Sequence, residues 1–390
     1  MKPALLILFV AGLALAHLGH SGEDSKVHVC VHDTKFKDHK PRVMEEVSDQ
    51  EFKRLLQIDP NAGLTGQTTS GSTSTNSGAT TYTGYGGNPN VQDGWHEMRI
   101  LVDYTYANRL IANYASLNTK YQMAIRLVES VRSYFMNSLR VNFMPVMKFS
   151  GGSCYNNKIP AYEMPIDLFI TIYPENDSST SYFAAATPCY LSTRDGRPTI
   201  GAYILNFAFL KATPLNEYLY FSTFAHEFTH ILGFSDDLFE RYIDSSGRKR
   251  ALSDVVTTVN IGSETFKAIK LPEVLSYART YFSCNNIQGV PLENNGGSGS
   301  AGSHWEKLFL PQEYMNPTVE NPGILSEFTM TLLRATGWYQ VNYKAAQNYD
   351  WGKGAGCGIF SICPQGGTGY CTDSQVGSSI CSSEWYSKVC

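Results

Sequence analysis

The stretch AHEFTHILGF, residues 225–234, contains residue types at the spacing of a metal-dependent hydrolase. His226 and His230 are four positions apart, so on a helix both imidazoles lie on one face and reach a single metal ion. Glu227 adjoins the first histidine, where its carboxylate can accept a proton from water without binding the metal itself. Gly233, three residues after the second histidine, is placed to end the helix. The pattern predicts zinc-dependent hydrolysis of peptide bonds in which no acyl-enzyme forms.

Spacing alone leaves the third metal ligand open between two residues. Asp236 follows Gly233 by three positions, the spacing of a compact His-x-x-Gly-x-x-ligand arrangement, and a carboxylate oxygen can bind zinc. His304 lies much further along the chain, directly after the Gly/Ser-rich stretch 296–303, which would allow the chain to return to the metal. On spacing, Asp236 is slightly favoured.

The patterns around this helix predict an α+β domain. Residues 98–106 and 166–173 predict strands, and residues 121–140 carry apolar side chains at the spacing of a helix. Residues 195–207 predict a turn followed by a strand, and the helix through Glu227 comes next. We therefore expect an active-site helix that packs under a sheet.

Composition and the N-terminus indicate an exported globular protein. The chain has 390 residues, 43% of them hydrophobic, which is enough for a sizeable core. A net charge of −4 gives no electrostatic footprint for nucleic acid. Residues 1–16 have the basic start, short apolar run and small-x-small end of a signal peptide, and no later run approaches the roughly 20 apolar residues of a membrane span. We expect a secreted, extracellular or cell-surface protein without a transmembrane helix.

Nine cysteines fit export, where disulfides are the usual state. Their odd number leaves one that is free, intermolecular or lost with a removed segment. Cys30 stands alone in the first 150 residues, between two histidines in HVCVHD. Residues 43–57 predict a short helix, and the Gly/Ser/Thr-rich residues 63–90 cannot bury enough apolar surface to fold. We interpret this region as a pro-segment with a linker.

Four stretches together resemble the leishmanolysin family, zinc endopeptidases of the metzincin type. They are HEFTHILGFS, the run from PEVLSYARTYFSC to GSHWEK, then EYMNP and TGWY. The resemblance covers residues 98–357 and implies a long insertion before the third ligand. It implies one Zn²⁺ ion bound by His226, His230 and His304, with Glu227 as general base. Met315 becomes the methionine of a turn that supports the metal from beneath, and Asp236 is displaced from the ligand position.

The same resemblance implies several further features. Cys30 would block the zinc as a thiolate until the pro-segment is removed; the alternative from the cysteine count is an ordinary disulfide. The implied disulfides are Cys154–Cys189 and Cys284–Cys357. The implied division of the chain is a signal peptide at 1–16, a pro-segment with linker at 17–92, an N-terminal catalytic subdomain at 93–240, an insertion at 241–303, a subdomain with the third ligand and the methionine turn at 304–345, and a cysteine-rich tail at 346–390.

These observations predict a zinc metalloendopeptidase, made as a zymogen, that cuts proteins or peptides internally. The sequon at Asn176 predicts glycosylation in an exported protein. Members of the family are associated with cell adhesion, so the resemblance also implies association with the cell surface. The rival hypothesis is a non-catalytic adhesion protein on the same scaffold, which would have no need for Glu227.

Overall fold

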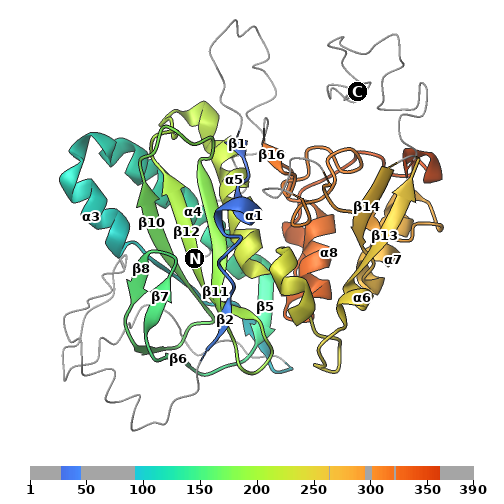
Figure 1. Ribbon diagram of the computed structural model, residues 1–390, viewed down its shortest axis with the longest axis horizontal. Helices are drawn as coiled ribbons and strands as arrows, with labels where there is room; N and C mark the ends of the chain where they lie inside the picture. Colours follow the sequence, from blue (N-terminus) through green and yellow to red (C-terminus); the bar gives the residue numbers. More distant parts are fainter. Residues whose placement is uncertain (1–27, 45–92, 263, 295–300, 320–321, 361–390) are drawn as a thin grey trace, which may run out of the picture.

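The computed structural model describes residues 28–44, 93–262, 264–294, 301–319 and 322–360 (Figure 1). Its largest sheet has five strands, with β11 antiparallel to β12 and the three strands β4, β10 and β12 parallel. In spatial order the strands are β2 (Arg42–Val43), β11 (Ala184–Leu191), β12 (Pro198–Asn206), β10 (Leu168–Glu175) and β4 (Ile100–Asp103).

One face of this sheet is covered by the long helices α4 (Asn118–Ser138) and α5 (Pro214–Leu232). Tyr203 of β12 and Ile231 of α5 belong to the same buried cluster. Gly201 makes the close approach of α5 possible, because a Cβ atom there would lie 2.7 Å from the Ile231 side chain. The helix that carries His226 and His230 is therefore pressed directly onto the sheet.

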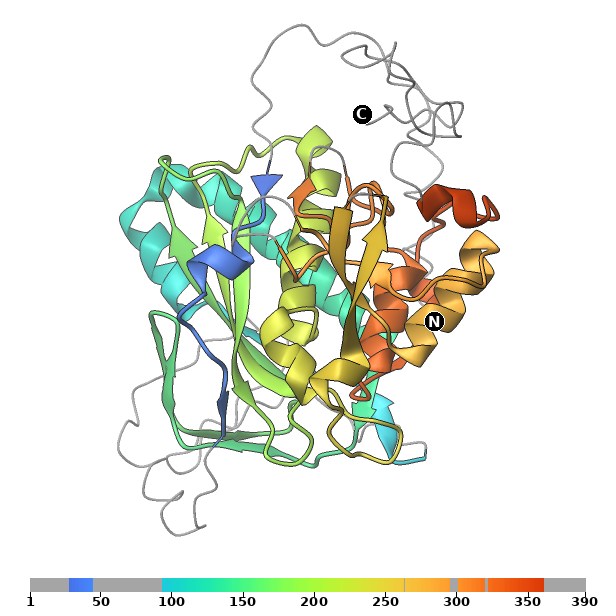
Figure 2. The same cartoon turned by 45° about the vertical axis from the view of Figure 1, so that its right-hand side comes forward.

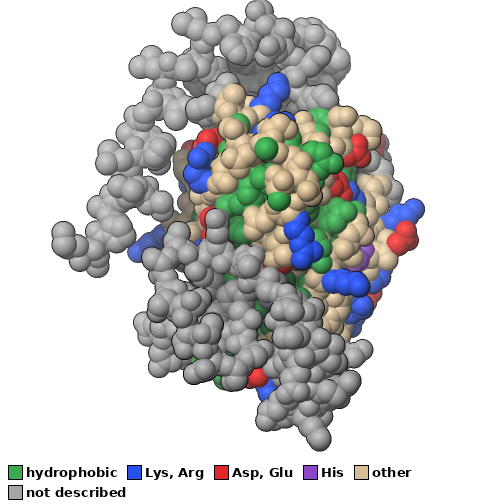
Figure 3. Space-filling model, turned by 90° about the vertical axis from the view of Figure 1, so that its left-hand side faces the viewer, with side chains coloured by type: hydrophobic (Ala, Val, Ile, Leu, Met, Phe, Trp, Pro, Cys, Tyr) green, Lys and Arg blue, Asp and Glu red, His purple; other side chains and the backbone are tan. Residues whose placement is uncertain are grey.

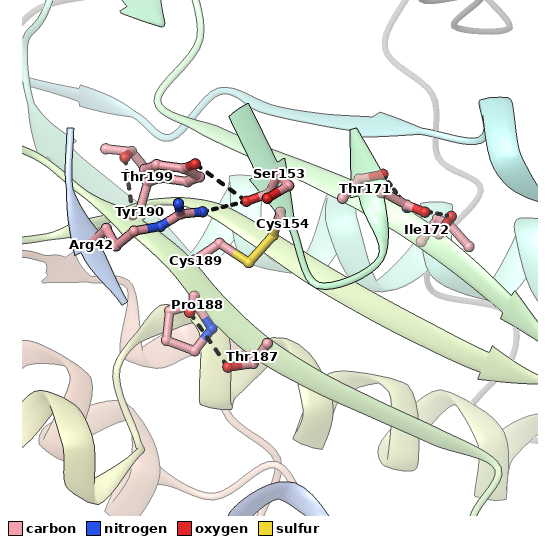
Figure 4. Close-up of a disulfide and its surroundings, with 11 residues drawn as sticks. Arg42, Ser153, Cys154, Thr171, Ile172, Thr187, Pro188, Cys189, Tyr190 and Thr199 are labelled. Atoms are coloured by element: carbon pink, nitrogen blue, oxygen red, sulfur yellow. Dashed lines mark hydrogen bonds between the residues drawn. A yellow bond between two sulfur atoms is a disulfide. The ribbon is translucent and has the colours of Figure 1, made fainter. Parts of the chain in front are cut away.

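The other face of the sheet is covered by two small hairpins. Their strands are β6 (Met147–Phe149) with β9 (Tyr162–Met164), and β7 (Gly152–Cys154) with β8 (Asn157–Ile159). A disulfide between Cys154 and Cys189 joins the second hairpin to β11 (Figure 4). This pair is one of the two that the family resemblance implied.

A second lobe follows α5, and one buried core continues into it. It contains a sheet of β13 (Val256–Ile261), β14 (Glu264–Ile269) and β15 (Val290–Pro291), and the helices α6 (Leu252–Val255), α7 (Pro272–Phe282) and α8 (Glu327–Ala335). The helices α7 and α8 contact each other, and the Cys284–Cys357 disulfide, the second implied pair, ties the end of α7 to the last described turn.

The remaining elements are short. They are α1 (His32–Lys35), α3 (Thr105–Asn113), the paired strands β1 (His28–Val29) and β16 (Thr318–Val319), the sheet of β3 (Trp95–Glu97), β5 (Leu139–Asn142) and β17 (Gln340–Val341), and the 3-10 turns η1 (Ala115–Leu117), η2 (Asp236–Arg241), η4 (Tyr343–Ala345) and η5 (Cys357–Phe360). On the face viewed in Figure 3, basic side chains of the coloured residues are scattered.

The α+β fold is as the sequence predicted, with one local correction. The strand predicted over residues 98–106 ends at Asp103, and helix α3 begins at Thr105. The physical reason is a local hydrogen bond that starts the helix, since the Asp103 carboxylate accepts from the Thr105 backbone N–H at 3.0 Å and from its hydroxyl at 2.6 Å.

Several predictions fall partly or wholly outside the described residues. The signal peptide, the linker and most of the helix predicted over residues 43–57 lie there, although Val43 at its start is a strand residue. Only residues 346–360 of the cysteine-rich tail are described. Among the described helices, none combines the length and apolar character that crossing a bilayer requires.

Candidate metal centre

Helix α5 ends where its sequence predicted. Gly233 has φ +153°, a conformation that favours glycine, and its N–H donates to the Thr229 carbonyl at 3.0 Å. A Cβ atom at this position would lie 3.3 Å from the Trp338 ring. The last turn of the helix therefore presents His226 and His230 on one face, inside the protein, where both are fully buried.

Three histidine nitrogens meet at this face. His226 Nε2 lies 3.0 Å from His230 Nε2 and 3.2 Å from His304 Nε2. The Cys30 sulfur is 3.5 Å from His230 Nε2, and the four candidate ligand atoms all lie within 4.8 Å of one another. The chain thus brings together two residues of α5, one residue of the second lobe and one cysteine of segment 28–44.

Hydrogen bonds to the Nδ1 atoms of His226 and His230 determine the protonation of their Nε2 atoms. His226 Nδ1 lies 2.6 Å from the Tyr314 carbonyl oxygen, and His230 Nδ1 lies 2.7 Å from the Phe234 carbonyl oxygen. A carbonyl only accepts, so each Nδ1 carries the proton and each Nε2 presents a lone pair. Two lone pairs 3.0 Å apart repel each other unless a cation lies between them.

The donor set and its spacing fit zinc. Tetrahedral zinc with bonds of about 2.1 Å to nitrogen and 2.3 Å to sulfur separates its ligand atoms by roughly 3.4–3.6 Å, close to the 3.0–3.5 Å found here. Burial and the nearby Glu227 carboxylate raise the pKa of the Cys30 thiol, so its thiolate needs a cation beside it. His226, His230, His304 and Cys30 are the residues that could hold the metal.

Asp236 does not join these residues. It begins the 3-10 turn η2 after α5, and its backbone N–H donates to the Ser303 hydroxyl at 3.1 Å. The ligand atoms that converge in the described part of the chain do not include its carboxylate. Asp236, which spacing slightly favoured as the third ligand, instead holds the loop that carries His304 through its backbone N–H.

Comparison with known proteins identifies the family of this chain. A profile of the M8 peptidase family, described as leishmanolysin, matches residues 136–383, which is more than half of the 390 residues. The chain belongs to the leishmanolysin family. The matched span includes α5, His304 and Met315, so the leishmanolysin-family match extends over both lobes.

Individual relatives align over a smaller region. A leishmanolysin-like peptidase of Drosophila pseudoobscura pseudoobscura is 30% identical over 203 residues, which are 45% of this chain and 30% of that protein. A leishmanolysin-like peptidase of Caenorhabditis elegans is 34% identical over 165 residues, 35% of this chain and 25% of that protein. Leishmanolysin of Leishmania chagasi is 28% identical over 214 residues, 53% of this chain and 33% of that protein. The chain therefore spans only a quarter to a third of these relatives' length.

The leishmanolysin-family chain places Met315 in a buried turn beside the three histidines. Its backbone carbonyl accepts from the Trp305 N–H at 3.0 Å, and Trp305 directly follows His304. Tyr314, on the other side of Met315, provides the carbonyl that orients His226. The methionine turn thus contacts, through its backbone, both of the segments that carry the three histidines.

Glu227 is buried next to the ligand atoms. Its Oε1 oxygen lies 3.7 Å from the Cys30 sulfur, and its side chain has no exposed surface. Burial raises the pKa of Glu227 well above its ordinary value. Burial thus favours the protonated carboxyl of Glu227 over its carboxylate.

Segment 28–44 crosses the site as two short strands, β1 and β2, with helix α1 between them, drawn in blue beside α5 and β11 in Figures 1 and 2. At one end β1 pairs with β16, and the Cys30 N–H donates to the Pro317 carbonyl at 3.0 Å. At the other end β2 pairs with the edge strand β11. The segment thereby bridges the two lobes across the histidine cluster.

Side chains of this segment make specific contacts with the lobe that contains the five-stranded sheet. Lys35 lies 3.0 Å from the Glu175 carboxylate, and its ammonium is 4.6 Å from the centre of the Tyr182 ring. The Arg42 guanidinium lies 4.5 Å from the centre of the Tyr190 ring and donates to the Ser153 carbonyl (Figure 4). No local sequence pattern predicted these contacts, because each depends on tertiary pairing.

His32 is a second residue of the segment that packs on the site. Its ring stacks on His230 with centroids 4.0 Å apart, and its two nitrogens lie 2.7 Å from the Ala186 carbonyl oxygen and 2.9 Å from the Ser235 hydroxyl. The next residue, Asp33, accepts from the Ser303 hydroxyl at 2.7 Å. The HVCVHD motif was the only sequence feature that drew attention to this residue, because the position of His32 in the chain does not match the spacing of a metal ligand.

The glycosylation candidate Asn176 is exposed, directly after β10. It lies in the loop between β10 and β11, where a glycan can be accommodated. Cys30 is a free, buried cysteine among the described residues.

Proposed function

We propose that this chain is a zinc-dependent metalloendopeptidase that is made as a latent zymogen. The observation that carries the proposal is the convergence of three histidine Nε2 atoms, 3.0 and 3.2 Å apart, beside the buried carboxylate Glu227. The leishmanolysin-family match supports peptide bonds as the substrate. A purely adhesive protein would not need a buried carboxylate at this position.

In this proposal His226, His230 and His304 hold one zinc ion. Zinc bound there supplies Lewis-acid chemistry, which polarises a peptide carbonyl and lowers the pKa of a water molecule towards 7. The carbonyls of Tyr314 and Phe234 keep the imidazoles of His226 and His230 in the tautomer that presents Nε2. Met315 supports the turn that supplies the first of these carbonyls.

Glu227 performs the proton transfers. Its carboxylate accepts a proton from the water that attacks the peptide carbonyl. The carboxyl then donates this proton to the amine nitrogen as the carbon–nitrogen bond breaks, which returns Glu227 to its ionised form. Because burial raises its pKa, the carboxyl can hold the proton between the two steps.

The substrate occupies the surface that segment 28–44 covers. An extended peptide would pair with the edge strand β11, as β2 does in the precursor, once the segment has been removed. Cys30 keeps the precursor latent by taking the fourth ligand position beside His230. Cutting within the linker at 63–90 would release the segment from the enzyme.

The organisation that we propose for the whole chain follows the sequence-based division. Residues 1–16 direct export, residues 17–92 form the pro-segment, and residues 93–345 form the catalytic unit with its insertion at 241–303. Residues 346–390 form a cysteine-rich tail. We infer a secreted or cell-surface protein that is glycosylated at Asn176.

The test compares Glu227→Gln with a matched substitution in the full chain. After proteolytic removal of the pro-segment, zinc content and casein cleavage are measured for wild type, Glu227→Gln and Glu240→Gln, which changes an exposed carboxylate of η2. We expect one zinc ion in all three. Cleavage should fall by roughly 10²–10⁴-fold only in Glu227→Gln.

Two outcomes would overturn the proposal. Absence of zinc from the wild type would remove the metal assignment. Zinc in the wild type without cleavage of casein or of a mixed peptide library would favour the non-catalytic hypothesis.

A further inference from the structure

A second carboxylate, Glu313, is buried beside the histidine cluster and has no role in the proton transfers. It is 1% exposed and precedes the methionine turn. Its Oε2 oxygen accepts from the Met315 backbone N–H at 2.6 Å. Its Oε1 oxygen accepts from the hydroxyls of Ser326 and Thr329, at 2.8 and 2.6 Å.

The direction of these hydrogen bonds is fixed by the groups behind them. The Ser326 hydroxyl already accepts from the Phe328 backbone N–H at 3.1 Å, as the N-cap of α8. The Thr329 hydroxyl accepts from the Trp305 indole N–H at 2.9 Å. Each hydroxyl therefore directs its own proton to Glu313, and the Met315 N–H is a donor as well. A side chain that only accepts is required here.

One branch of this network leads to His226. Tyr314, which directly follows Glu313, accepts from His226 Nδ1 on its backbone carbonyl and contacts the Thr229 hydroxyl through its own, at 2.9 Å. His226 and Thr229 are both residues of α5. By holding the Met315 N–H, the carboxylate fixes the turn from which the Tyr314 carbonyl reaches this helix.

The other branch leads to His304. Trp305 is the residue after His304, and its indole N–H is bound by Thr329, whose own proton goes to Glu313. Its backbone N–H is bound by the Met315 carbonyl at 3.0 Å. The carboxylate is therefore linked to the segment of His304 by two routes.

We propose that Glu313 is a positioning residue that holds the side chains of His226 and His304 in the relative position that metal binding requires. The two histidines belong to segments far apart in the chain. Glu313 is linked to the first through Tyr314, the residue that follows it, and to the second through the hydrogen bonds of Thr329 and Met315 with Trp305. It acts through Tyr314 and Trp305 and does not touch the metal or the substrate. The inference rests on the proposed function, since it assumes that these histidines hold a metal.

The test is the substitution Glu313→Gln in the full chain. Glutamine has the same shape but replaces one accepting oxygen with an amide NH₂, which would face a donor and leave it unpaired. We expect the zinc affinity, measured by competition with a chromophoric chelator, to fall by roughly 10–100-fold, as for other residues that orient metal ligands. In the activated enzyme, kcat should fall while KM changes little, because the substrate surface is intact.

The matched control is Asp167→Asn, which alters another buried carboxylate that accepts from a backbone N–H and an arginine. It should lower Tm and leave zinc affinity unchanged. If Glu313→Gln also lowers Tm without changing zinc affinity, its role is structural and the inference is wrong. If the wild type binds no zinc, the proposed function has failed instead.

A second pair of variants applies if Glu313→Gln does not fold. Thr329→Val removes the hydroxyl that links Trp305 to Glu313, whereas Thr329→Ser keeps it. We expect weaker zinc binding in the valine variant and affinity within about twofold of wild type in the serine variant. The valine variant loses both hydrogen bonds of the hydroxyl, the one accepted from the Trp305 indole and the one donated to Glu313, whereas serine keeps both. Equal zinc affinities in the two variants would overturn the inference.

Discussion

Two buried groups of polar side chains contain histidine, and they are built in opposite ways. In the group that we call the Asp167 cluster, the Asp167 carboxylate accepts from the Arg99 guanidinium at 2.9 and 3.0 Å and lies 3.3 Å from His96 Nε2. Arg197 donates to the Asp167 backbone carbonyl at 3.0 Å. Burial raises the pKa of Asp167, but the nearby His96 ring and the hydrogen bonds from Arg99 outweigh it and leave the pKa below its ordinary value. Opposite charges within the protein complete this cluster.

The histidine cluster of His226, His230 and His304 brings like groups together. Burial, and then the neighbouring histidines, lower the pKa of His230 well below its ordinary value. Each neutral ring presents a lone pair to the others, and the nearest nitrogens are 3.0 Å apart. Groups that attract one another stabilise a fold by themselves. Groups that repel one another in a buried position indicate that a cation is to be added, and this difference separates a structural cluster from a functional one.

The largest expected effect concerns the third ligand. His304→Ala should weaken zinc binding by more than about 100-fold, because it removes a proposed ligand, whereas residues behind the ligands contribute 10–100-fold. Activity should be lost with the metal. Asp236→Ala is the matched control and should keep both, since its backbone rather than its carboxylate holds the His304 loop. Chelator competition and casein cleavage measure both; the reverse pattern would make Asp236 the ligand.

The next prediction breaks the Asp167 cluster. Asp167→Asn leaves two buried arginines short of their counter-ion, so the free energy of unfolding should fall by roughly 3–5 kcal/mol. Urea unfolding at saturating zinc measures this loss. Asp254→Asn, an exposed change on α6, should stay within about 0.5 kcal/mol of wild type. If Asp167→Asn instead weakens zinc binding at unchanged stability, the two clusters do not differ as proposed.

A pH titration of chelator-treated protein also separates the two clusters. Burial lowers the pKa of His226 to about 4, against about 6.5 in an unfolded chain. Between these values only the unfolded chain binds the proton, so the contribution of His226 to the free energy of unfolding should fall by roughly 3 kcal/mol as the pH drops from 6.5 towards 4. Burial raises the pKa of Glu306 and of Glu313 to about 7, so these carboxyls change the stability in the opposite direction over the same range, and the loss is taken as the difference from a variant without His226. Asp167 contributes no loss in this window, since its lowered pKa makes its stabilisation disappear only below about pH 3.9.

Denaturation midpoints between pH 7 and 4 measure this loss. His226→Asn, also treated with chelator, is the control and should show a flatter profile. Parallel profiles for chelator-treated wild type and His226→Asn would contradict the comparison. With zinc bound, protonation must displace the metal, so the decline should depend on zinc concentration.

Local patterns predicted the part of the site that is contiguous in the chain. His226, Glu227 and His230 followed from helical periodicity, and Gly233 marked the end of α5, because both depend on backbone geometry within a few residues. The third ligand could not be derived in this way. Spacing favoured Asp236, whereas the structure brings His304 to the cluster through the pairing of Leu292 with Trp305. That pairing depends on tertiary structure, and only the family resemblance anticipated it.

The residues that support the site from behind could be predicted even less from the sequence. Glu313, in the loop PQEYMNP, has the polar character of a surface residue, and nothing local indicates that three donors surround it. Lys35 likewise reads as one more surface lysine. Its pocket is formed by Glu175 and Tyr182, which lie on two different strands. Burial of charged groups is decided by partners distant in sequence, so it escapes pattern analysis.

The smallest expected effect concerns the contacts that hold segment 28–44 over the histidine cluster. Lys35 and Glu175 are mostly buried and their charged atoms lie 3.0 and 3.2 Å apart, and such hydrogen bonds contribute about 1.5–3 kcal/mol. In Lys35→Met the segment should therefore open at least roughly tenfold more often.

Labelling of Cys30 by a thiol reagent in the full-length chain measures this opening, with Cys30→Ser giving the background from other cysteines. Lys40→Met removes a largely exposed ion pair with Asp237 and should change the rate by less than about twofold. Equal labelling rates in the two variants would show that the backbone and Cys30, rather than the lysine pocket, hold the segment closed.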